Sequence, residues 1–221
     1  MAFAVYFAVI AIRSHMQNNE LAVDELMKGE CYRFLAACFY QPKKEILCAE
    51  HFLSTLIENL QHVCPAAAPY AQRMQESLET YTEEELTVEY ASLFVGPFGL
   101  KAPPYGSVYL DNDRTVMGPS TMETISFYES EGLARDEEFN ELPDHIAVEL
   151  EFMYFLSYRQ VEALQKGDMA LTKMYQQKQE DFRSRFLGKW VQTFCTHIQN
   201  ETDNGFYKTL AECLNTFIKG A

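Results

Sequence analysis

One stretch restricts the possible folds of this chain more than any other: LFVGPFGLKAPPYGSVYLD, from Leu93 to Asp111. Three glycines and three prolines fall within eleven of its positions, and these residues free the backbone or remove its hydrogen-bond donors. The stretch can therefore be neither a regular helix nor a central strand. It is also apolar, whereas ordinary loops are short and polar. We expect a long loop that packs onto the body of the protein or lines a binding site.

A second piece, NELPDHIAVELEF from Asn140 to Phe152, predicts a loop that enters a helix at Asp144 and His145. The free N–H groups at a helix start favour polar ligands, so both side chains are candidates for the rim of a site. In the alternative interpretation Asp144 is only an N-cap and His145 only a first-turn residue. We expect the two pieces together to form a peptide-binding site that the remaining helices hold in place.

Carboxylates flank this junction, and the expected acidic rim consists of Glu138, Glu141 and Glu149. Such a rim would attract a basic peptide and raise its encounter rate, although a run of acids can also be an ordinary solvated face. A hydrolytic or GTP-binding protein that uses Asp144 and His145 is the alternative function, but no nucleophile elbow and no phosphate-binding loop accompanies the pair. A purely structural adaptor, with the loop packed as core, is a third hypothesis. We expect no metal site.

The rest of the chain predicts an all-α fold, a single globular helical domain of nine or ten helices with short connections. Apolar residues recur at helical spacing, and prolines, glycines and caps mark the boundaries. Two capping boxes are expected, Thr82 with Glu85 and Ser120 with Glu123, and Asp168 is expected to cap a later helix. The expected helices cover about 20–40, 43–63, 69–81, 83–94, 121–132, 140–167, 169–187, 189–199 and 205–219.

Composition and charge narrow the class of partner. The net charge of −14 argues against nucleic acid and anionic membranes, because phosphate contacts need clustered Lys and Arg. The six cysteines form no CxxC pair, which favours core thiols in a reducing compartment over disulfides or zinc. The uncharged N-terminal run is too short to span a bilayer, and Ser14-His15-Met16 is typical of a cloning scar. We therefore expect a vector-derived or disordered leader over 1–16 and the helical domain over 17–221.

Three motifs in order, LFVGPFGLKAPPYGSVYLD, DRTVMGPSTMETISFYESEGL and NELPDHIAVELEFMYFL, resemble the TorD/DmsD-type chaperones of molybdenum-containing oxidoreductases, also called redox enzyme maturation proteins. They cover about a quarter of the chain, and NGFYKTLAECL near the C-terminus is a weaker match. The resemblance implies an all-helical, cytoplasmic protein that is not an enzyme. Such a chaperone binds the twin-arginine signal peptide and the apo form of a dimethyl-sulfoxide- or trimethylamine-oxide-reductase-like partner, assists cofactor insertion and prevents premature export.

The resemblance also implies which residues contact the signal peptide: Leu93, Phe98, Pro104, Tyr105, Gly118, Asp144 and His145. Phe98 and Tyr105 stand where relatives often carry tryptophan, so aromaticity is kept while the indole N–H is lost. The implied protein has no cofactor beyond weak GTP binding, which nothing in this sequence supports independently. It is a monomer or a domain-swapped homodimer, with a hinge expected near Gly132–Asn140.

Overall fold

The computed structural model describes residues 20–49, 51–96, 99–111, 116–134 and 141–220. The leader expected over residues 1–16 lies outside these ranges, as do Phe98, Glu138 and most of the expected hinge. The described part of the chain is all-α, as predicted, and its only β pairing is an isolated bridge between Tyr105 and His145.

The described residues form eleven α-helices and one π-helical turn, one or two more helices than expected. In chain order these are α2 (Glu20–Ala37), α3 (Lys44–Leu47), α4 (Phe52–Val63), α5 (Ala68–Thr80), α6 (Glu83–Tyr90), η1 (Ala91–Val95), α7 (Ser107–Leu110), α8 (Pro119–Ser130), α9 (Ile146–Gln165), α10 (Met169–Arg185), α11 (Leu187–Glu201) and α12 (Gly205–Gly220).

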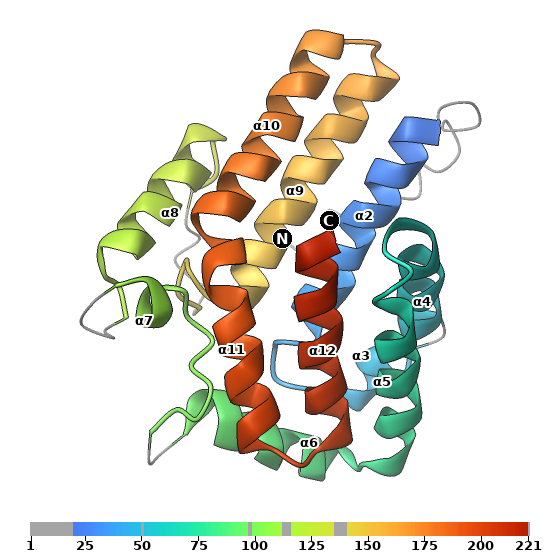
Figure 1. The fold of residues 1–221 in the computed structure, drawn as a ribbon, viewed down its shortest axis with the longest axis vertical. Helices are drawn as coiled ribbons and strands as arrows, with labels where there is room; N and C mark the ends of the chain where they lie inside the picture. The colour runs from blue at the N-terminus through green and yellow to red at the C-terminus, as the bar shows by residue number, and fades with distance from the viewer. Residues whose placement is uncertain (1–19, 50, 97–98, 112–115, 135–140, 221) are drawn as a thin grey trace.

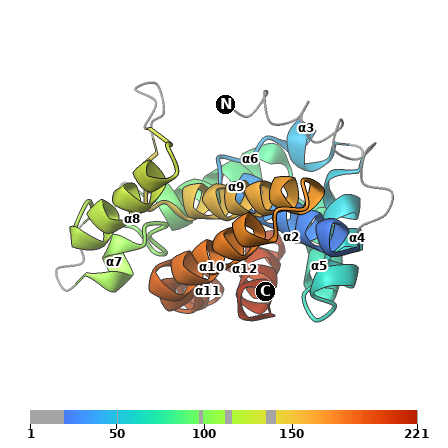
Figure 2. The ribbon, with the colours of Figure 1, turned by 90° about the horizontal axis from the view of Figure 1, so that it is seen from above.

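The long helices α9 and α10 form an antiparallel hairpin, and α2 lies along the other side of α9 (Figure 1). Helix α12 packs between α5 and α11, and α4 packs against both α2 and α5. The short helices α7 and α8 lie together at one edge of the molecule, and α6 crosses its lower end, as Figures 1 and 2 show from two directions. The loop between η1 and α7 thus runs beside the N-terminal end of α9.

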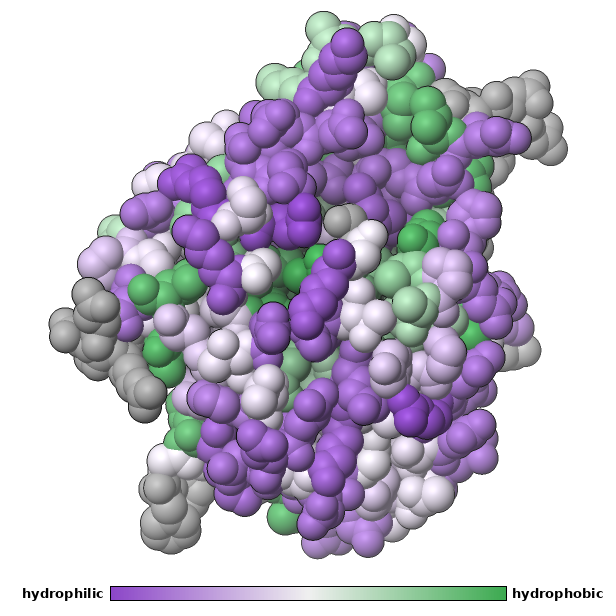
Figure 3. Space-filling model, viewed as in Figure 1, coloured by the Kyte–Doolittle hydropathy of each residue, from purple (hydrophilic) through white to green (hydrophobic). Residues whose placement is uncertain are grey.

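One large core joins these helices. Its centre is aromatic, with Trp190 and Phe194 from α11 and Tyr207 and Phe217 from α12 all fully buried. The ring of Tyr32 from α2 meets Phe217 edge to face at 4.8 Å between centroids, a geometry that aromatic pairs prefer. The face formed by α10, α11 and α12 is mostly hydrophilic, with small separate apolar patches (Figure 3). This is the distribution expected of a chain with a net charge of −14.

The single helix expected over 43–63 is wrong. The chain forms α3, turns, and forms α4, because His51 adopts a left-handed conformation with φ of 72° that cannot continue a right-handed helix. The Lys44 side chain donates a hydrogen bond to the carbonyl oxygen of Tyr81 at 2.6 Å, so α3 is held by contacts 37 residues away. Ile46 in α3 is 45% exposed.

The expected cap at Thr82 is confirmed. Thr82 Oγ1 accepts a hydrogen bond from the Glu85 N–H at 3.2 Å, and the Thr82 N–H donates to the Glu85 carboxylate at 2.8 Å. The expected cap at Asp168 is also confirmed, since its carboxylate accepts from the Leu171 N–H at 3.0 Å. These local motifs satisfy the free N–H groups at helix starts without help from the rest of the fold.

The capping box expected from Ser120 and Glu123 is wrong. Helix α8 begins two residues earlier than that motif requires, with Gly118 at its N-cap. Its free N–H groups are served instead by Asp111, whose carboxylate accepts from the Ser120 N–H at 3.3 Å and from the Ser120 hydroxyl at 2.9 Å. The Glu123 carboxylate turns outward and pairs with Arg185 on α10 at 3.0 Å.

Candidate functional site

The two sequence pieces singled out above meet in the structure. Tyr105 and His145 form an antiparallel bridge. The Gly106 N–H donates to the carbonyl oxygen of Asp144, and the Ile146 N–H donates to the carbonyl oxygen of Pro104, both at 2.8 Å. The proline-rich loop is thereby attached to the start of α9, about 40 positions further along the chain. The prediction that these pieces lie together is confirmed.

Asp144 is an internal residue, only 1% exposed. Its Oδ2 atom accepts a hydrogen bond from the Ser107 N–H at 2.8 Å, so its carboxylate caps the first turn of α7. Its Oδ1 atom is buried without a hydrogen-bond partner. The N-cap of α9 is His145, not Asp144. Asp144 therefore fixes the position of the loop around Ser107 and does not present its carboxylate on a rim.

His145 caps α9 with its ring: Nδ1 accepts a hydrogen bond from the Ala147 N–H at 3.2 Å. An accepting Nδ1 places the single proton of a neutral imidazole on Nε2. Burial lowers the pKa of His145 to about 4, so the ring is neutral at pH 7. The Nε2 atom lies 3.9 Å from the Glu141 carboxylate, which is too long for a hydrogen bond.

Two tyrosines flank the His145 ring. Tyr105, half-buried, meets it edge to face at 5.5 Å between centroids, and Tyr40 stacks on it at 6.1 Å with an interplanar angle of 18°. Tyr40 follows α2 and was not among the residues expected at the site. Sequence periodicity groups it with the helix before Pro42, and its one distinctive signal is its place at a proline-terminated helix end.

The expected acidic rim is only partly realised. Glu141 is half-buried, and desolvation raises its pKa. Glu149 is not on a rim at all: it is fully buried, and its Oε2 atom accepts a hydrogen bond from the Trp190 indole N–H at 3.0 Å. Burial, with a smaller contribution from the charge of Asp144, raises the pKa of Glu149 well above its ordinary value. Glu138 lies outside the described residues.

The buried side chains of Glu149 and Trp190 pack against the loop at Gly106. A Cβ atom added at Gly106 would lie 3.0 Å from Trp190 Nε1 and 3.1 Å from Glu149 Oε1, so only glycine fits there without displacement. Tyr109 stacks on the Trp190 ring at 5.4 Å, and its hydroxyl donates to the carbonyl oxygen of Pro103 at 2.9 Å. At Gly106 and Tyr109 the loop region is therefore packed closely against α9 and α11.

Three further site expectations fall on buried or closely packed positions. Leu93 is fully buried in η1, and its carbonyl oxygen accepts from the Ala102 N–H at 3.0 Å, which fixes the base of the loop. Pro104 is buried as well. A Cβ atom at Gly118 would lie 2.2 Å from the Asp111 carboxylate that caps α8. These residues shape the site, whereas Tyr105 is the one that the structure leaves half-exposed.

Part of the apolar stretch from Leu93 to Asp111 belongs to the core and does not line a site. Phe94 is buried in the core against Phe39 and Phe194. The geometry does not support the hydrolytic alternative either. Among the hydrogen bonds of the described residues, none joins Asp144 to His145, and the Ser107 hydroxyl is buried without a partner.

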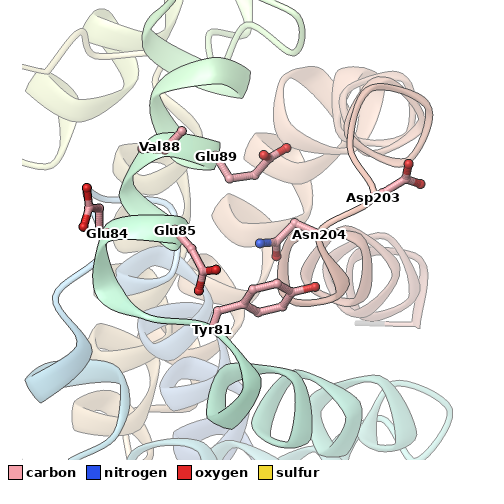
Figure 4. A pocket seen from close by; sticks show the side chains of 7 residues that line it. All are labelled: Tyr81, Glu84, Glu85, Val88, Glu89, Asp203 and Asn204. Carbon is pink, nitrogen blue, oxygen red and sulfur yellow. The ribbon is translucent and has the colours of Figure 1, made fainter.

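A separate open cleft of about 520 Å³ lies between α6 and the start of α12 (Figure 4). It is lined by Tyr81, Glu84, Glu85, Val88, Glu89, Asp203 and Asn204. Most of its carboxylates already have partners: Glu85 belongs to the capping box of α6, Glu89 accepts from the Thr202 hydroxyl, and Asp203 pairs with Lys208 at 2.8 Å. These acids serve helix ends and helix contacts.

Within the described ranges, no group of three or more His, Cys, Asp or Glu side chains has the arrangement of a metal site. No helix in those ranges combines the length and apolar character that crossing a membrane requires. The described cysteines are free thiols, and all but Cys48 are buried. Burial raises the pKa of Cys31 and Cys38, which disfavours the reactive thiolate.

Comparison with known proteins places the chain in context. Residues 54–196 match the family model described as nitrate reductase delta subunit. The chain is 30% identical over 113 residues to the Tat proofreading chaperone DmsD of Salmonella typhi, which covers 51% of this chain and 55% of that protein. It is 31% identical over 133 residues to the chaperone protein TorD of Photobacterium profundum, or 60% of each chain. The matched region thus spans little more than half of these two relatives.

A longer alignment joins the chain to the chaperone protein TorD of Aliivibrio salmonicida, with 27% identity over 210 residues, 91% of this chain and 95% of that one. Among solved structures, a protein of Archaeoglobus fulgidus assigned as a redox enzyme maturation protein superposes with a TM-score of 0.55 at 22% identity. That superposition covers 92% of this chain and 96% of the other. It shows a shared all-α fold.

Proposed function

From the premise that this chain belongs to the nitrate reductase delta subunit family and is a TorD/DmsD-type maturation chaperone, we propose a specific ligand. The chain binds the twin-arginine signal peptide of a molybdopterin oxidoreductase. It holds the apo form of that partner, of the dimethyl sulfoxide or trimethylamine oxide reductase type, while the cofactor is inserted, and it delays export. It acts in the cytoplasm and catalyses no reaction itself.

The bridge between the loop and α9 is the observation that supports this proposal most directly. It brings the half-exposed ring of Tyr105 against His145, and both residues lie in the motifs on which the resemblance to these chaperones rests. The surrounding residues are buried and closely packed, so this part of the surface is preorganised, and preorganisation reduces the ordering cost of binding. Tyrosine supplies a large contact area at low conformational cost and is typical of peptide-binding surfaces.

Charge complements the apolar contact. A twin-arginine leader has a cationic end and an apolar segment, and the net charge of this chain is −14. At about 0.15 M salt, charges farther apart than roughly 8 Å are screened. The overall negative charge therefore increases the association rate, while the rings at the bridge and direct contacts contribute most of the affinity.

The test is the affinity of purified protein for a synthetic peptide with an Arg-Arg pair followed by an apolar segment, measured by isothermal titration calorimetry. Tyr105→Ala removes the exposed ring at the bridge, and we expect about a tenfold weaker Kd, equivalent to about 1.4 kcal/mol. Tyr70→Ala on α5 is the matched control, because Tyr70 is another half-buried tyrosine. Equal affinity of both variants and the unaltered protein would reject the assignment of this surface.

A further inference from the structure

The Glu141 carboxylate lacks a counter-charge in the described part of the chain. Its only contact at ion-pair distance there is the His145 Nε2 atom at 3.9 Å, and the Glu141 side chain is 33% exposed. Because the pKa of His145 is about 4, the imidazole is uncharged at pH 7 and this contact is not an ion pair. Glu141 is thus a partly desolvated anion that would gain from a cation brought to it.

Three tyrosine side chains, Tyr40, Tyr90 and Tyr105, lie within electrostatic range of this carboxylate. Burial and, to a smaller extent, the charge of Glu141 raise the pKa of Tyr90 to about 12 and also raise the pKa of Tyr105. Both phenol groups are therefore within electrostatic reach of Glu141. Tyr40, which follows α2 in the chain, stacks on the His145 ring. The carboxylate and the rings come from four separate segments of the chain.

His145 adds a second polar group beside Glu141. The residue is 99% buried, since only 1% of it is exposed, and its Nδ1 atom is occupied by the Ala147 N–H. Among the hydrogen bonds of the described residues, none uses Nε2, and the Glu141 carboxylate lies 3.9 Å from it. The Nε2 proton is therefore available for a carbonyl oxygen of a bound chain.

We propose that Glu141, Tyr40 and His145 form a subsite for one arginine residue of an extended peptide. The guanidinium group pairs with the Glu141 carboxylate and lies against the tyrosine rings, while the His145 Nε2–H donates to a peptide carbonyl oxygen. Arginine suits this place better than lysine, because its planar group can form two parallel hydrogen bonds to a carboxylate and also stack on aromatic rings. This subsite rests on the proposed function and assigns one end of the peptide to it.

A double-mutant cycle between protein and peptide tests this pairing. The peptide carries Arg-Arg or has citrulline, the uncharged isostere of arginine, at the first or the second position. Glu141→Gln removes the charge of the carboxylate without changing its size. We expect a loss of about tenfold in affinity from Glu141→Gln, the same loss from citrulline at one of the two positions, and little further loss when both changes are combined.

Glu84→Gln is the control for net charge, because Glu84 is an exposed acid in the cleft beside α6. We expect it to show no coupling to either citrulline. Tyr40→Ala should weaken binding of the Arg-Arg peptide severalfold, and Tyr40→Phe, which keeps the ring, should not.

The outcomes separate the two proposals. If the unaltered protein binds the Arg-Arg peptide but the effects of Glu141→Gln and citrulline multiply independently at both positions, the subsite is wrong and the proposed function stands. If the unaltered protein does not bind the peptide at all, the proposed function is rejected, and the subsite is rejected with it.

Discussion

Replacement of Glu149 by glutamine tests whether this buried carboxyl group, which pairs with Trp190 beneath the loop, has a raised pKa. The Glu149 side chain is fully buried, one carboxylate oxygen accepts from Trp190 at 3.0 Å, and the other has no hydrogen-bond partner. Burial and the nearby Asp144 raise the pKa of Glu149 well above 4.5. Glutamine keeps the shape and an oxygen that can accept from Trp190, but it has no proton to exchange.

The sign and size of the effect follow from linkage. Between pH 4.5 and the higher pKa of the folded state, folded protein holds a proton on Glu149 that unfolded protein has released. The contribution of Glu149 to stability is therefore fully present below pH 4.5 and falls as the pH rises, by about 1.4 kcal/mol per pH unit. Glu149→Gln lacks this loss. The free energy of unfolding of the variant, minus that of the unaltered protein, should therefore increase by about 1.4 kcal/mol for each pH unit in this window.

Urea unfolding at pH 5, 6 and 7 measures the difference. We expect the stability of Glu149→Gln relative to the unaltered protein to increase with pH until the pH passes the raised pKa of Glu149 in the folded state. Glu84→Gln, which removes an exposed carboxylate, should show a difference that is nearly independent of pH. A constant difference for Glu149→Gln between pH 5 and 7 would show that Glu149 has an ordinary pKa and would refute the reasoning.

Two other changes probe the packing around the loop. Trp190→Phe removes the N–H that donates to Glu149, and the unpaired buried carboxyl group should lower the free energy of unfolding by about 1–3 kcal/mol in urea titrations; no loss would mean that this hydrogen bond is not formed. Gly118→Ala places a Cβ atom 2.2 Å from the Asp111 carboxylate, so α8 should lose its cap at Ser120 at a cost of about 1–2 kcal/mol. An equal loss from Gly118→Ala in an Asp111→Ala background would contradict the clash.

Much of the fold could be predicted because local signals decide it. Helical spacing gave the long helices, and the caps at Thr82 and Asp168 depend only on residues three positions apart. The expected cap at Ser120 failed because Asp111, nine positions away, competes for the same N–H groups. The break at His51 depends on a backbone conformation for which no glycine or proline gave a signal.

The site was predicted less completely, for the same physical reason. Resemblance and helix-start chemistry identified Tyr105, Asp144 and His145, which the structure brings together. Charge patterning could not distinguish Glu149 from a solvated acid, because its burial depends on Trp190, 41 positions away. Tyr40 was missed because it is brought to the site by a contact between the segment after α2 and the N-cap of α9, which no local pattern encodes.

Photo-crosslinking of a twin-arginine leader peptide to the protein tests the central claim most directly. The peptide carries a photoreactive amino acid next to the Arg-Arg pair, and cross-linked protein segments are identified by mass spectrometry. We predict cross-links to 103–107 and 141–147, the two segments joined by the bridge between Tyr105 and His145. Cross-links concentrated instead on α6 and residues 203–204, around the separate acidic cleft, would contradict it.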